Sequence, residues 1–373
     1  MDIKKIFHPV NYLGFKTKRK IVIIESDDWG NEKLNNKNHF SRVLNENLIN
    51  DSPYFKYDSL ETNQDLEFLF NILSEFTDIN GNHPKITGNF VVANPDYKAI
   101  KKDSYEKYHF TPTIELYSRD TRRDKVLNLY KNAIKEGIFM PQYHCREHLD
   151  VDRWMKALIN DDELAIRAFN NNFVNMNFEQ NTGKRKGISA SFDFDQNFDQ
   201  NMFTSYLEDM KTLFYDMFGF YSTTFIAPAY TWHQNLEQYL SRIGVKALQG
   251  NWKQTAPFPN DIQKPYRYIM HYIGQSNKYK QKYLVRNSSF EPSIFPYKDV
   301  VRECLDNIRI AFKFGKPATI GSHRINFIGS IEESNRTHNL KLFKELLSSI
   351  ISKWPDVEFM SSDQLEYLIN NPS

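Results

Sequence analysis

The chain has 373 residues, of which 40% are apolar, and it contains 29 Phe and 21 Tyr. This apolar content can bury a sizeable core, so the composition excludes a largely disordered protein. The 48 basic and 46 acidic residues nearly cancel, which leaves no overall positive charge of the kind that binds nucleic acid, and we expect no nucleic-acid partner.

The cysteines and the N-terminal residues indicate the compartment. Cys145 and Cys304 are the two cysteines, which offers no disulfide framework and fits a reducing environment. The first residues lack the apolar segment of about 7–15 residues of a secretory signal, and no run approaches the roughly 18 apolar residues of a membrane span. We therefore expect a cytoplasmic protein without a transmembrane segment. Residues 1–20 are basic at both ends and aromatic between, which leaves peripheral contact with a membrane surface open.

Short apolar runs alternate along the chain with longer segments that have apolar residues at three-to-four spacing. The strands predicted in chain order are 20–24, 86–93, 137–143, 187–194, 222–228, 245–250, 317–322 and 357–361. This alternation is typical of βα units around a parallel sheet. We expect a closed or nearly closed α/β barrel in a single domain over 1–373, with a doubly wound open sheet as the alternative. Residues 265–292 break the alternation and predict an inserted β-hairpin with a polar connection.

Polar side chains follow several of these strands directly. Asp27 and Asp28 come after the first strand, His144 and His148 after the third, and His323 after the strand at 317–322. In parallel barrels and in open parallel sheets, the reacting groups lie just beyond the carboxyl ends of the strands. We therefore expect these side chains to lie at one end of the sheet.

The two histidines and the two aspartates predict a metal site more strongly when they are considered together. His144 and His148 are four residues apart, so on a helical turn both imidazoles would project from one face and could bind one metal ion. Taken alone, they could equally be a partly buried surface pair, and two aspartates after a strand are most often a turn or a helix N-cap. Together, one carboxylate and two imidazoles form an open three-ligand site, and the second carboxylate can accept a proton from water.

Four short motifs occur in the same order as in a known family. The segments "SDDWG", "HCREH", "APAY" and "SHR" resemble the motifs T-F-D-D-G, H-[ST]-x-x-H, R-x-P-x-G and L-x-H of the polysaccharide deacetylase (NodB-homology) superfamily, carbohydrate esterase family four. The resemblance spans about residues 20 to 330. It implies an irregular (β/α) barrel of seven to eight parallel strands.

The resemblance also implies a role for each matching residue. Asp27 would be the general base, and His323 would be the general acid that protonates the leaving amine or alkoxide. The backbone N–H of Ala229 would stabilise the oxyanion. The ligands of a divalent metal ion, usually Zn²⁺, would be Asp28, His144 and His148.

Some positions depart from the family motifs. Gly321 replaces the leucine of the last motif, and Ile226 stands where the family has the arginine that steadies the base. Arg324 or Arg146 could supply that positive charge from elsewhere. Leu248 lacks the carboxylate that the family uses to orient the acid histidine.

Other aromatic and charged residues each have two interpretations. Trp29 and Trp232, next to the first and third motifs, could stack on a sugar ring, although aromatic side chains more often belong to the core. Arg286, Asn287 and Glu291, in the predicted hairpin, could hydrogen-bond sugar hydroxyls, although a solvated connection is the commoner case.

These observations together predict a metal-dependent hydrolase that removes an acyl group, with N-acetyl favoured, from a sugar or polysaccharide precursor. The substrate would be an acetylated sugar, a nucleotide-sugar or a lipid-linked saccharide of surface polysaccharide metabolism. Ile226 and Leu248 leave open a carbohydrate-binding relative without turnover. A glycosidase is disfavoured because Asp27 and Asp28 are adjacent, whereas the carboxylates of glycosidases flank the bond about 5 Å or more apart.

Overall fold

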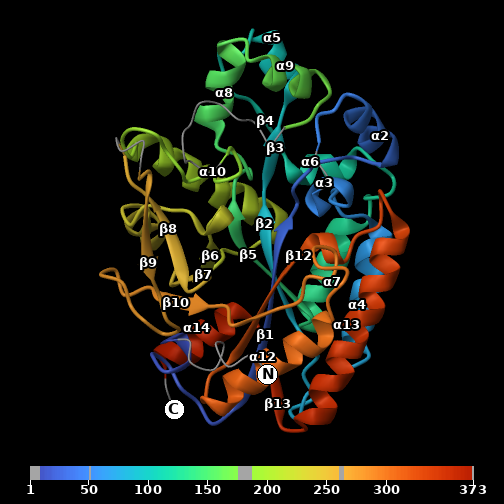
Figure 1. Cartoon of the computed structure of the whole chain (residues 1–373), viewed down its shortest axis with the longest axis vertical. Coiled ribbons are helices and arrows are strands. Elements are labelled where there is room, and N and C mark those ends of the chain that lie inside the picture. The colour runs from blue at the N-terminus through green and yellow to red at the C-terminus, as the bar shows by residue number, and fades with distance from the viewer. Residues whose placement is uncertain (1–8, 50–51, 175–186, 260–263, 372–373) are drawn as a thin grey trace.

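A curled parallel sheet forms the centre of the molecule. The computed structural model describes residues 9–49, 52–174, 187–259 and 264–371. Within these ranges, nine strands form one sheet in the order β10-β7-β6-β5-β2-β1-β12-β11, with β13 also paired to β1 (Figure 1). The strands are β1 (Lys20–Trp29), β2 (Ile86–Val91), β5 (Phe139–Cys145), β6 (Thr224–Ile226), β7 (Ala247–Gly250), β10 (Lys282–Val285), β11 (Ser288–Ser289), β12 (Ala318–His323) and β13 (Val357–Met360). The expected α/β class and (β/α) barrel are confirmed.

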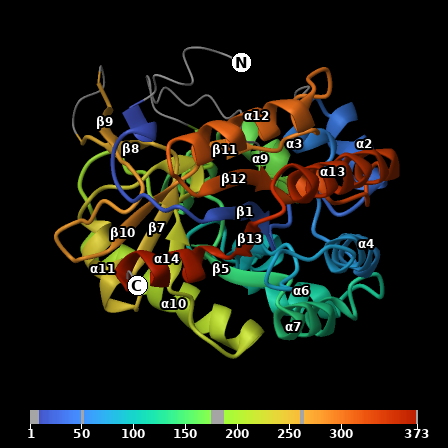
Figure 2. The same ribbon diagram turned by 90° about the horizontal axis from the view of Figure 1, so that it is seen from below.

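Helices surround the sheet, as the view along the strands shows (Figure 2). They are α2 (Lys37–Asn45), α3 (Pro53–Lys56), α4 (Asn63–Ser74), α5 (Tyr97–Lys102), α6 (Thr113–Ser118), α7 (Val126–Glu136), α8 (Val151–Ile159), α9 (Glu163–Asn170), α10 (Gln200–Phe218), α11 (Leu236–Arg242), α12 (Val300–Lys313), α13 (Glu333–Lys353) and α14 (Ser362–Asn370). Three 3-10 turns are η1 (Pro9–Asn11), η2 (Pro228–Tyr230) and η3 (Arg324–Asn326). Local signals set the ends of these helices. In α10, Asp199 caps the first turn by accepting from Met202 N, and Gly219 ends the helix at φ 75°.

The strand β1 separates two environments. Ile21 and Ile23 pack with β7, β10 and α14 inside the curl of the sheet, while the residues between them join the large core beneath the outer helices. Because successive strand residues alternate between faces, Glu25 and Asp27 continue along the interior side. The interior is therefore apolar near the start of β1 and charged near its end.

A short crossing segment joins the two edge strands of the sheet. β10 leads directly into β11, and between them Arg286 N donates to Gly250 O at 2.9 Å while Asn287 N donates to Thr319 O at 3.1 Å. The Asn287 side chain also bonds the β12 edge, at Pro317 O and Thr319 N. The segment thus ties β7 on one side to β12 on the other.

Two sequence predictions were wrong in this part of the fold. Residues 265–292 do not form one inserted hairpin, because β9 (Tyr266–Met270) pairs antiparallel with β8 (Lys253–Pro257), while β10 pairs parallel with β7 in the main sheet. The antiparallel contact within this range is the isolated bridge between Ser276 and Lys282. Residues 187–194 form no strand, although their apolar positions are buried. Alternating burial predicts which side chains face inward, and it does not determine whether the backbone finds a neighbouring strand.

Two further features concern membrane contact and the outer strands. None of the described helices is long and apolar enough to cross a membrane. The N-terminal stretch considered for membrane contact lies partly outside the described residues, because residues 1–8 are not among them. A second small sheet pairs β3 (Ala93–Pro95) with β4 (Phe110–Pro112).

Candidate active site

The end of β1 places two adjacent aspartates in one site. In a regular strand, successive side chains point to opposite faces, so Asp28 would point away from the interior that Asp27 faces. The pairing of β1 with β2 shifts register between Ser26 and Trp29, and Asp28 has a left-handed backbone with φ 73°. This irregularity redirects Asp28, and both carboxylates are buried, with 4% exposure for Asp27 and 3% for Asp28.

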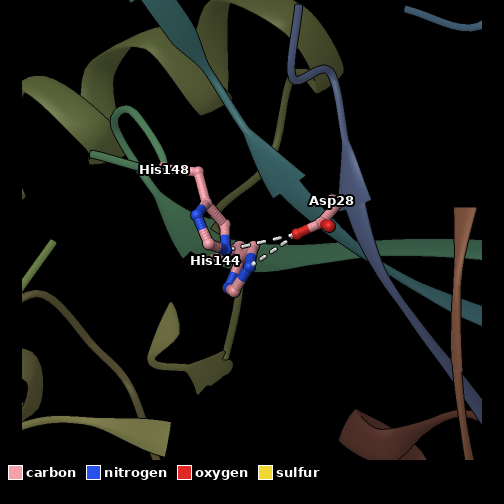
Figure 3. Close-up of side chains that lie close together, drawn as sticks. All are labelled: Asp28, His144 and His148. Carbon is pink, nitrogen blue, oxygen red and sulfur yellow. Dashed lines mark ion pairs between the residues drawn. The ribbon is translucent and has the colours of Figure 1, made fainter. Parts of the chain in front are cut away.

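Asp28 lies against two imidazoles that come from β5 and the loop after it (Figure 3). Its Oδ1 is 3.4 Å from His144 Nε2 and 3.4 Å from His148 Nε2, and the three ligand atoms lie within 4.8 Å of one another. Atoms placed tetrahedrally about 2.1 Å from a zinc ion are about 3.4 Å apart, so this spacing fits one cation. The histidines are not on a helical turn, because His144 is in β5 and His148 lies in the bend that follows.

The hydrogen bonds of the two imidazoles also fit metal binding. His144 Nδ1 is 2.8 Å from the Ile226 carbonyl oxygen, which can only accept, so Nδ1 carries a proton and Nε2 is the atom left to act as a ligand. This Nε2 is buried and has no hydrogen-bond partner in the described part of the chain. Burial lowers the pKa of His148 to about 4 against the pull of Asp28, so its imidazole is neutral at pH 7. Neutral imidazoles and an ionised carboxylate are the forms that bind Zn²⁺.

Lys33 approaches Asp28 from the side away from the imidazoles. Its Nζ is 3.6 Å from Asp28 Oδ2 and 2.9 Å from Asp58 Oδ2. Burial opposes ionisation of Asp28, but Lys33 and His148 lower its pKa well below its usual range. The candidate ligand is therefore a carboxylate at any working pH.

The two arginines suggested from the sequence serve other partners. Arg324 is fully buried and donates to Asp58 at 2.7 Å and to Glu61 at 2.8 Å, so it supports the carboxylate that holds Lys33. Arg146 donates to Glu147 at 2.6 and 2.7 Å and to Asp209 at 2.6 Å. The suggestion that either one steadies the base is therefore corrected.

Arg286, from the crossing segment, is the arginine that holds Asp27. Its two terminal nitrogens donate to the two oxygens of Asp27, each at 2.7 Å, and its Nε donates to Glu25 at 2.7 Å. Burial alone would raise the pKa of Asp27, but Arg286 outweighs it and lowers the pKa to about 2. Asp27 is thereby ionised and fixed in orientation.

His323 faces Asp27 from the neighbouring strand β12. The two residues are register partners, and His323 Nε2 is 3.8 Å from Asp27 Oδ2. On its other side, His323 Nδ1 is 2.6 Å from Glu291 Oε1, and Asn326 donates to the second oxygen of Glu291 at 2.7 Å. Burial would lower the pKa of His323, but the Glu291 carboxylate raises it to about 9. Glu291 is the carboxylate that the sequence lacks at Leu248.

Gly321 makes room for this arrangement. It is the register partner of Glu25, and a Cβ added to it would lie 2.7 Å from Arg286 Cδ. The leucine that the family motif has here would collide with the Arg286 side chain on its way to Asp27. Arg286, from the crossing segment, thus reaches Asp27 through the space that Gly321 leaves, whereas Ile226 offers no charge there.

Ala229 lies in the turn η2 that follows β6. Its φ is 53°, and that of Tyr230 is also 53°, which is a left-handed conformation that costs L-residues about 1 kcal/mol or more. The Tyr230 hydroxyl accepts from Arg286 at 3.2 Å, so this strained turn borders the site.

The two tryptophans proposed for sugar stacking belong to the core. Trp29 is 0% exposed and stacks on Phe327, and Trp232 is 2% exposed and stacks on His271. Their indole nitrogens are satisfied internally. Buried rings cannot stack on a sugar, so this expectation is corrected in favour of the core interpretation.

The sequence does carry a signal for the groups that were missed. Arg286 follows the apolar run at 283–285, in the same way that Asp27 follows the first strand. Because a hairpin was predicted over 265–292, the run at 283–285 was not recognised as a strand of the main sheet. Arg286 was therefore not recognised as a residue at the end of such a strand. Lys33 has no such signal, because it lies in a loop after β1.

Comparisons with known proteins give relatives in structure alone. No protein-family model and no curated protein matches the chain. A putative polysaccharide deacetylase from Mycobacterium smegmatis is 9% identical, with a TM-score of 0.46 over 96% of this chain and 93% of that one. A 4-α-glucanotransferase from Thermococcus litoralis is 10% identical, with a TM-score of 0.48 over 95% of this chain and 41% of that one. A probable polysaccharide deacetylase from Pseudomonas aeruginosa is 8% identical, with a TM-score of 0.46 over 95% of this chain and 93% of that one. The chain is thus similar, over most of its length, to solved structures that include polysaccharide deacetylases.

Proposed function

We propose that the chain is a metal-dependent hydrolase that removes an acyl group, in the first place N-acetyl, from a sugar. One observation carries the proposal: Asp28, His144 and His148, which could together hold one cation, lie beside a second carboxylate and an imidazole–carboxylate pair at the carboxyl ends of parallel strands. A divalent ion in such a site supplies Lewis-acid chemistry, polarising a carbonyl and lowering the pKa of water from about 15.7 toward about 7.

Asp27 acts as the general base in this proposal. The two hydrogen bonds from Arg286 fix its carboxylate, and they hold its pKa at about 2. A base this weak accepts a proton only from a water that is itself acidified, so the role of Asp27 depends on the neighbouring cation site. This dependence explains why the two aspartates are adjacent.

His323 acts as the general acid. With a pKa of about 9 it is protonated at neutral pH, and its Nε2 faces the reacting side while Nδ1 bonds to Glu291. When the tetrahedral centre collapses, the Nε2 proton passes to the leaving nitrogen or oxygen and the C–N or C–O bond breaks. Glu291 stabilises the imidazolium before this transfer and orients the ring.

The backbone N–H of Ala229 is the proposed donor to the developing oxyanion. A donor of this kind contributes about 2.7 to 4 kcal/mol to lowering the barrier. The left-handed backbone of Ala229 supports this role, because such strained residues cluster at active sites.

The experiment combines metal analysis with product analysis. Purified wild-type chain should contain a divalent metal in stoichiometric amount and release acetate from at least one member of a panel of N- and O-acetylated sugars. His148→Gln should lose both, whereas His338→Gln, an exposed histidine on α13, should lose neither. Acetate release that persists in full after chelation would refute the proposal.

Two departures from the family motifs suggested the alternative, a binding protein without turnover. They are the missing arginine at Ile226 and the missing carboxylate at Leu248. In this proposal Arg286, from the crossing segment, and Glu291, just after β11, take those functions. Metal binding without acetate release from any acetylated sugar would restore it.

The place of action is a separate proposal. We propose a cytoplasmic protein acting on a nucleotide-linked or lipid-linked sugar during surface polysaccharide assembly. Cell fractionation followed by detection of the chain tests this, and recovery from an extracellular or periplasmic fraction would contradict it.

A further inference from the structure

Three segments that are far apart in the sequence meet at the end of the barrel where β1 begins. Phe15 N donates to Ile273 O at 2.8 Å, and Thr17 N donates to Gly315 O at 2.8 Å. The loop 12–19 thereby lies between the chain that follows β9 and the end of α12, and it is the dark blue loop at the lower end of Figure 1. The candidate active site is at the opposite end of the strands.

Every charged residue in these three segments is a lysine or an arginine. The stretches 12–20, 272–282 and 312–317 contain no aspartate and no glutamate. Arg19 and Lys20 are paired with acids at the start of β13. The other exposed cations of these stretches form no ion pair within the described part of the chain, and they are Lys16, Lys18, Lys278, Lys280 and Lys313. This end of the molecule therefore carries a local positive charge, although the whole chain is nearly neutral.

The loop 12–19 is held in one conformation by contacts beneath it. The buried Lys316 donates from Nζ to the carbonyl oxygens of Leu13 and Phe15. Between these two residues, Gly14 has φ 82° and approaches Ile273 O so closely that a Cβ would collide with it. The backbone of the loop is therefore fixed by the residues that it packs on.

This fixed loop nevertheless leaves two large apolar side chains in water. Tyr12 is 46% exposed and Leu13 is 48% exposed. The Tyr12 ring is itself held in place, edge-on to Phe314 with ring centroids 4.9 Å apart. The fold gains little from an apolar side chain that it holds outward, because that surface stays hydrated. An apolar tip beside unpaired lysines is typical of an interaction surface.

The chemistry of this surface fits an anionic bilayer better than a nucleic acid. Each lysine near an anionic lipid surface raises the affinity about fivefold. A leucine can enter the layer below the headgroups, and a tyrosine ring suits the headgroup level because it has an apolar body and a polar hydroxyl. A nucleic acid could use the lysines through its phosphates, but its backbone offers no apolar layer for Leu13.

We propose that this surface, the basal patch, binds a bilayer that contains anionic phospholipid. The basal patch consists of Tyr12, Leu13 and the unpaired lysines named above. Strand β1 runs from Lys20 beside the patch to Trp29 at the site, and its 10 residues span about 30 Å. A docked molecule therefore presents the candidate active site to the aqueous phase. The proposal does not depend on the proposed function, because it concerns the other end of the strands.

Co-sedimentation of the full chain with lipid vesicles tests the proposal. Binding should be at least about tenfold stronger to phosphatidylcholine vesicles with about 30% phosphatidylserine than to phosphatidylcholine alone, and it should weaken at least about tenfold between about 0.1 M and 0.5 M salt. The double variant Lys16→Gln/Lys18→Gln should bind anionic vesicles at least about tenfold more weakly. The matched control is Lys131→Gln/Lys135→Gln, at two exposed lysines on α7, and it should bind as the wild type does.

A second variant separates a membrane from other polyanions. Leu13→Ser should weaken vesicle binding about fivefold or more and leave any binding to a DNA duplex unchanged, whereas Ile159→Ser, at a side chain 56% exposed on α8, should change neither. Equal binding to both kinds of vesicle, or tighter binding to the duplex than to anionic vesicles, would overturn the proposal. Vesicle binding that His148→Gln retains would support the basal patch whether or not the chain releases acetate.

Discussion

The guanidinium of Arg286 donates to two buried carboxylates at once. Asp27 takes both terminal nitrogens and Glu25 takes Nε, all at 2.7 Å. A planar fork of fixed geometry can do this, whereas the ammonium of lysine is a single point charge on a flexible stem. The orientation of Asp27 therefore depends on arginine chemistry as well as on positive charge.

We predict that Arg286→Lys keeps the fold but lowers kcat for acetate release by about 10- to 100-fold, the usual cost of removing a supporting residue of a metal site. KM should change little, because the lost contact is to the base and not to the substrate. Arg302→Lys, at a side chain 74% exposed on α12, is the matched control and should be neutral. A wild-type kcat in Arg286→Lys would show that Asp27 needs no such support.

His323 couples the site to pH. Its proton is available below its pKa of about 9, so kcat/KM should fall as pH rises through about 9. Glu291→Gln removes the carboxylate that raises this pKa, so the alkaline limb should move toward the ordinary value of about 6.5. The measurement is kcat/KM against pH for both proteins. An alkaline limb that stays in place in Glu291→Gln would mean that another group is the acid.

The same shift affects stability, with a sign that can be stated. Because the folded pKa of His323 is above the unfolded value, its contribution is complete below pH about 6.5 and is lost as pH rises through about 9. Glu291→Gln should therefore flatten the dependence of unfolding free energy on pH across this window, as urea titrations at several pH values would show.

At the scale of elements, the segment between β10 and β11 combines two tasks, because it crosses from one edge of the sheet to the other and supplies Arg286 to the site. The chain just past β11 supplies Glu291. The path of Arg286 crosses Gly321 on β12, where there is no room for a side chain. The same short segment therefore joins the two edges of the sheet and holds the Asp27 carboxylate in place.

We predict that Gly321→Ala lowers kcat by about tenfold or more while the protein stays folded, because the methyl group displaces Arg286 from Asp27. The control is Gly250→Ala at the end of β7, where an added Cβ would meet only Tyr230 Cδ1, at 3.7 Å. Circular dichroism and acetate release measured on both variants test this. Equal activity in the two would show that the close approach at Gly321 is without consequence.

The sequence predicts which residues form strands better than it predicts which strands pair with one another. Apolar runs place β1, β2, β5 and β12 correctly, and the polar residues at the carboxyl ends of β1 and β5, Asp27 and His144 among them, mark the candidate site. The same pattern misleads at 187–194, where the apolar side chains are buried but the backbone pairs with no strand. It also misleads at 265–292, where β9 and β10 belong to different sheets and do not form one hairpin. Strand pairing is decided by contacts far apart in the chain, which a local pattern does not contain.

At the scale of the whole molecule, the balance of buried charges at the site affects the stability of the fold. The site gathers more acids than cations: the acids are Asp27, Asp28, Asp58, Glu61 and Glu291, together with Glu25, whose pKa burial raises, and the cations are Lys33, Arg286, Arg324 and protonated His323. Buried charge without compensation is costly. A divalent cation at Asp28 would supply the missing positive charge and would link folding stability to metal binding.

We predict that chelation lowers the melting temperature and that added Zn²⁺ restores it. Free metal at 100 times its Kd stabilises the folded state by about 2.7 kcal/mol. Asp28→Ala should abolish the response, whereas Asp152→Ala, an exposed aspartate on α8, should keep it. A melting temperature that ignores chelator and metal would contradict the link between the charge of the site and stability.

The most direct test is a crystal structure of the chain grown with Zn²⁺, with anomalous data collected at the zinc edge. We predict one dominant peak about 2.0–2.2 Å from Asp28 Oδ1, His144 Nε2 and His148 Nε2. A peak elsewhere with this site empty, or the two imidazoles turned away from Asp28, would contradict a metal-dependent active site at the end of β1.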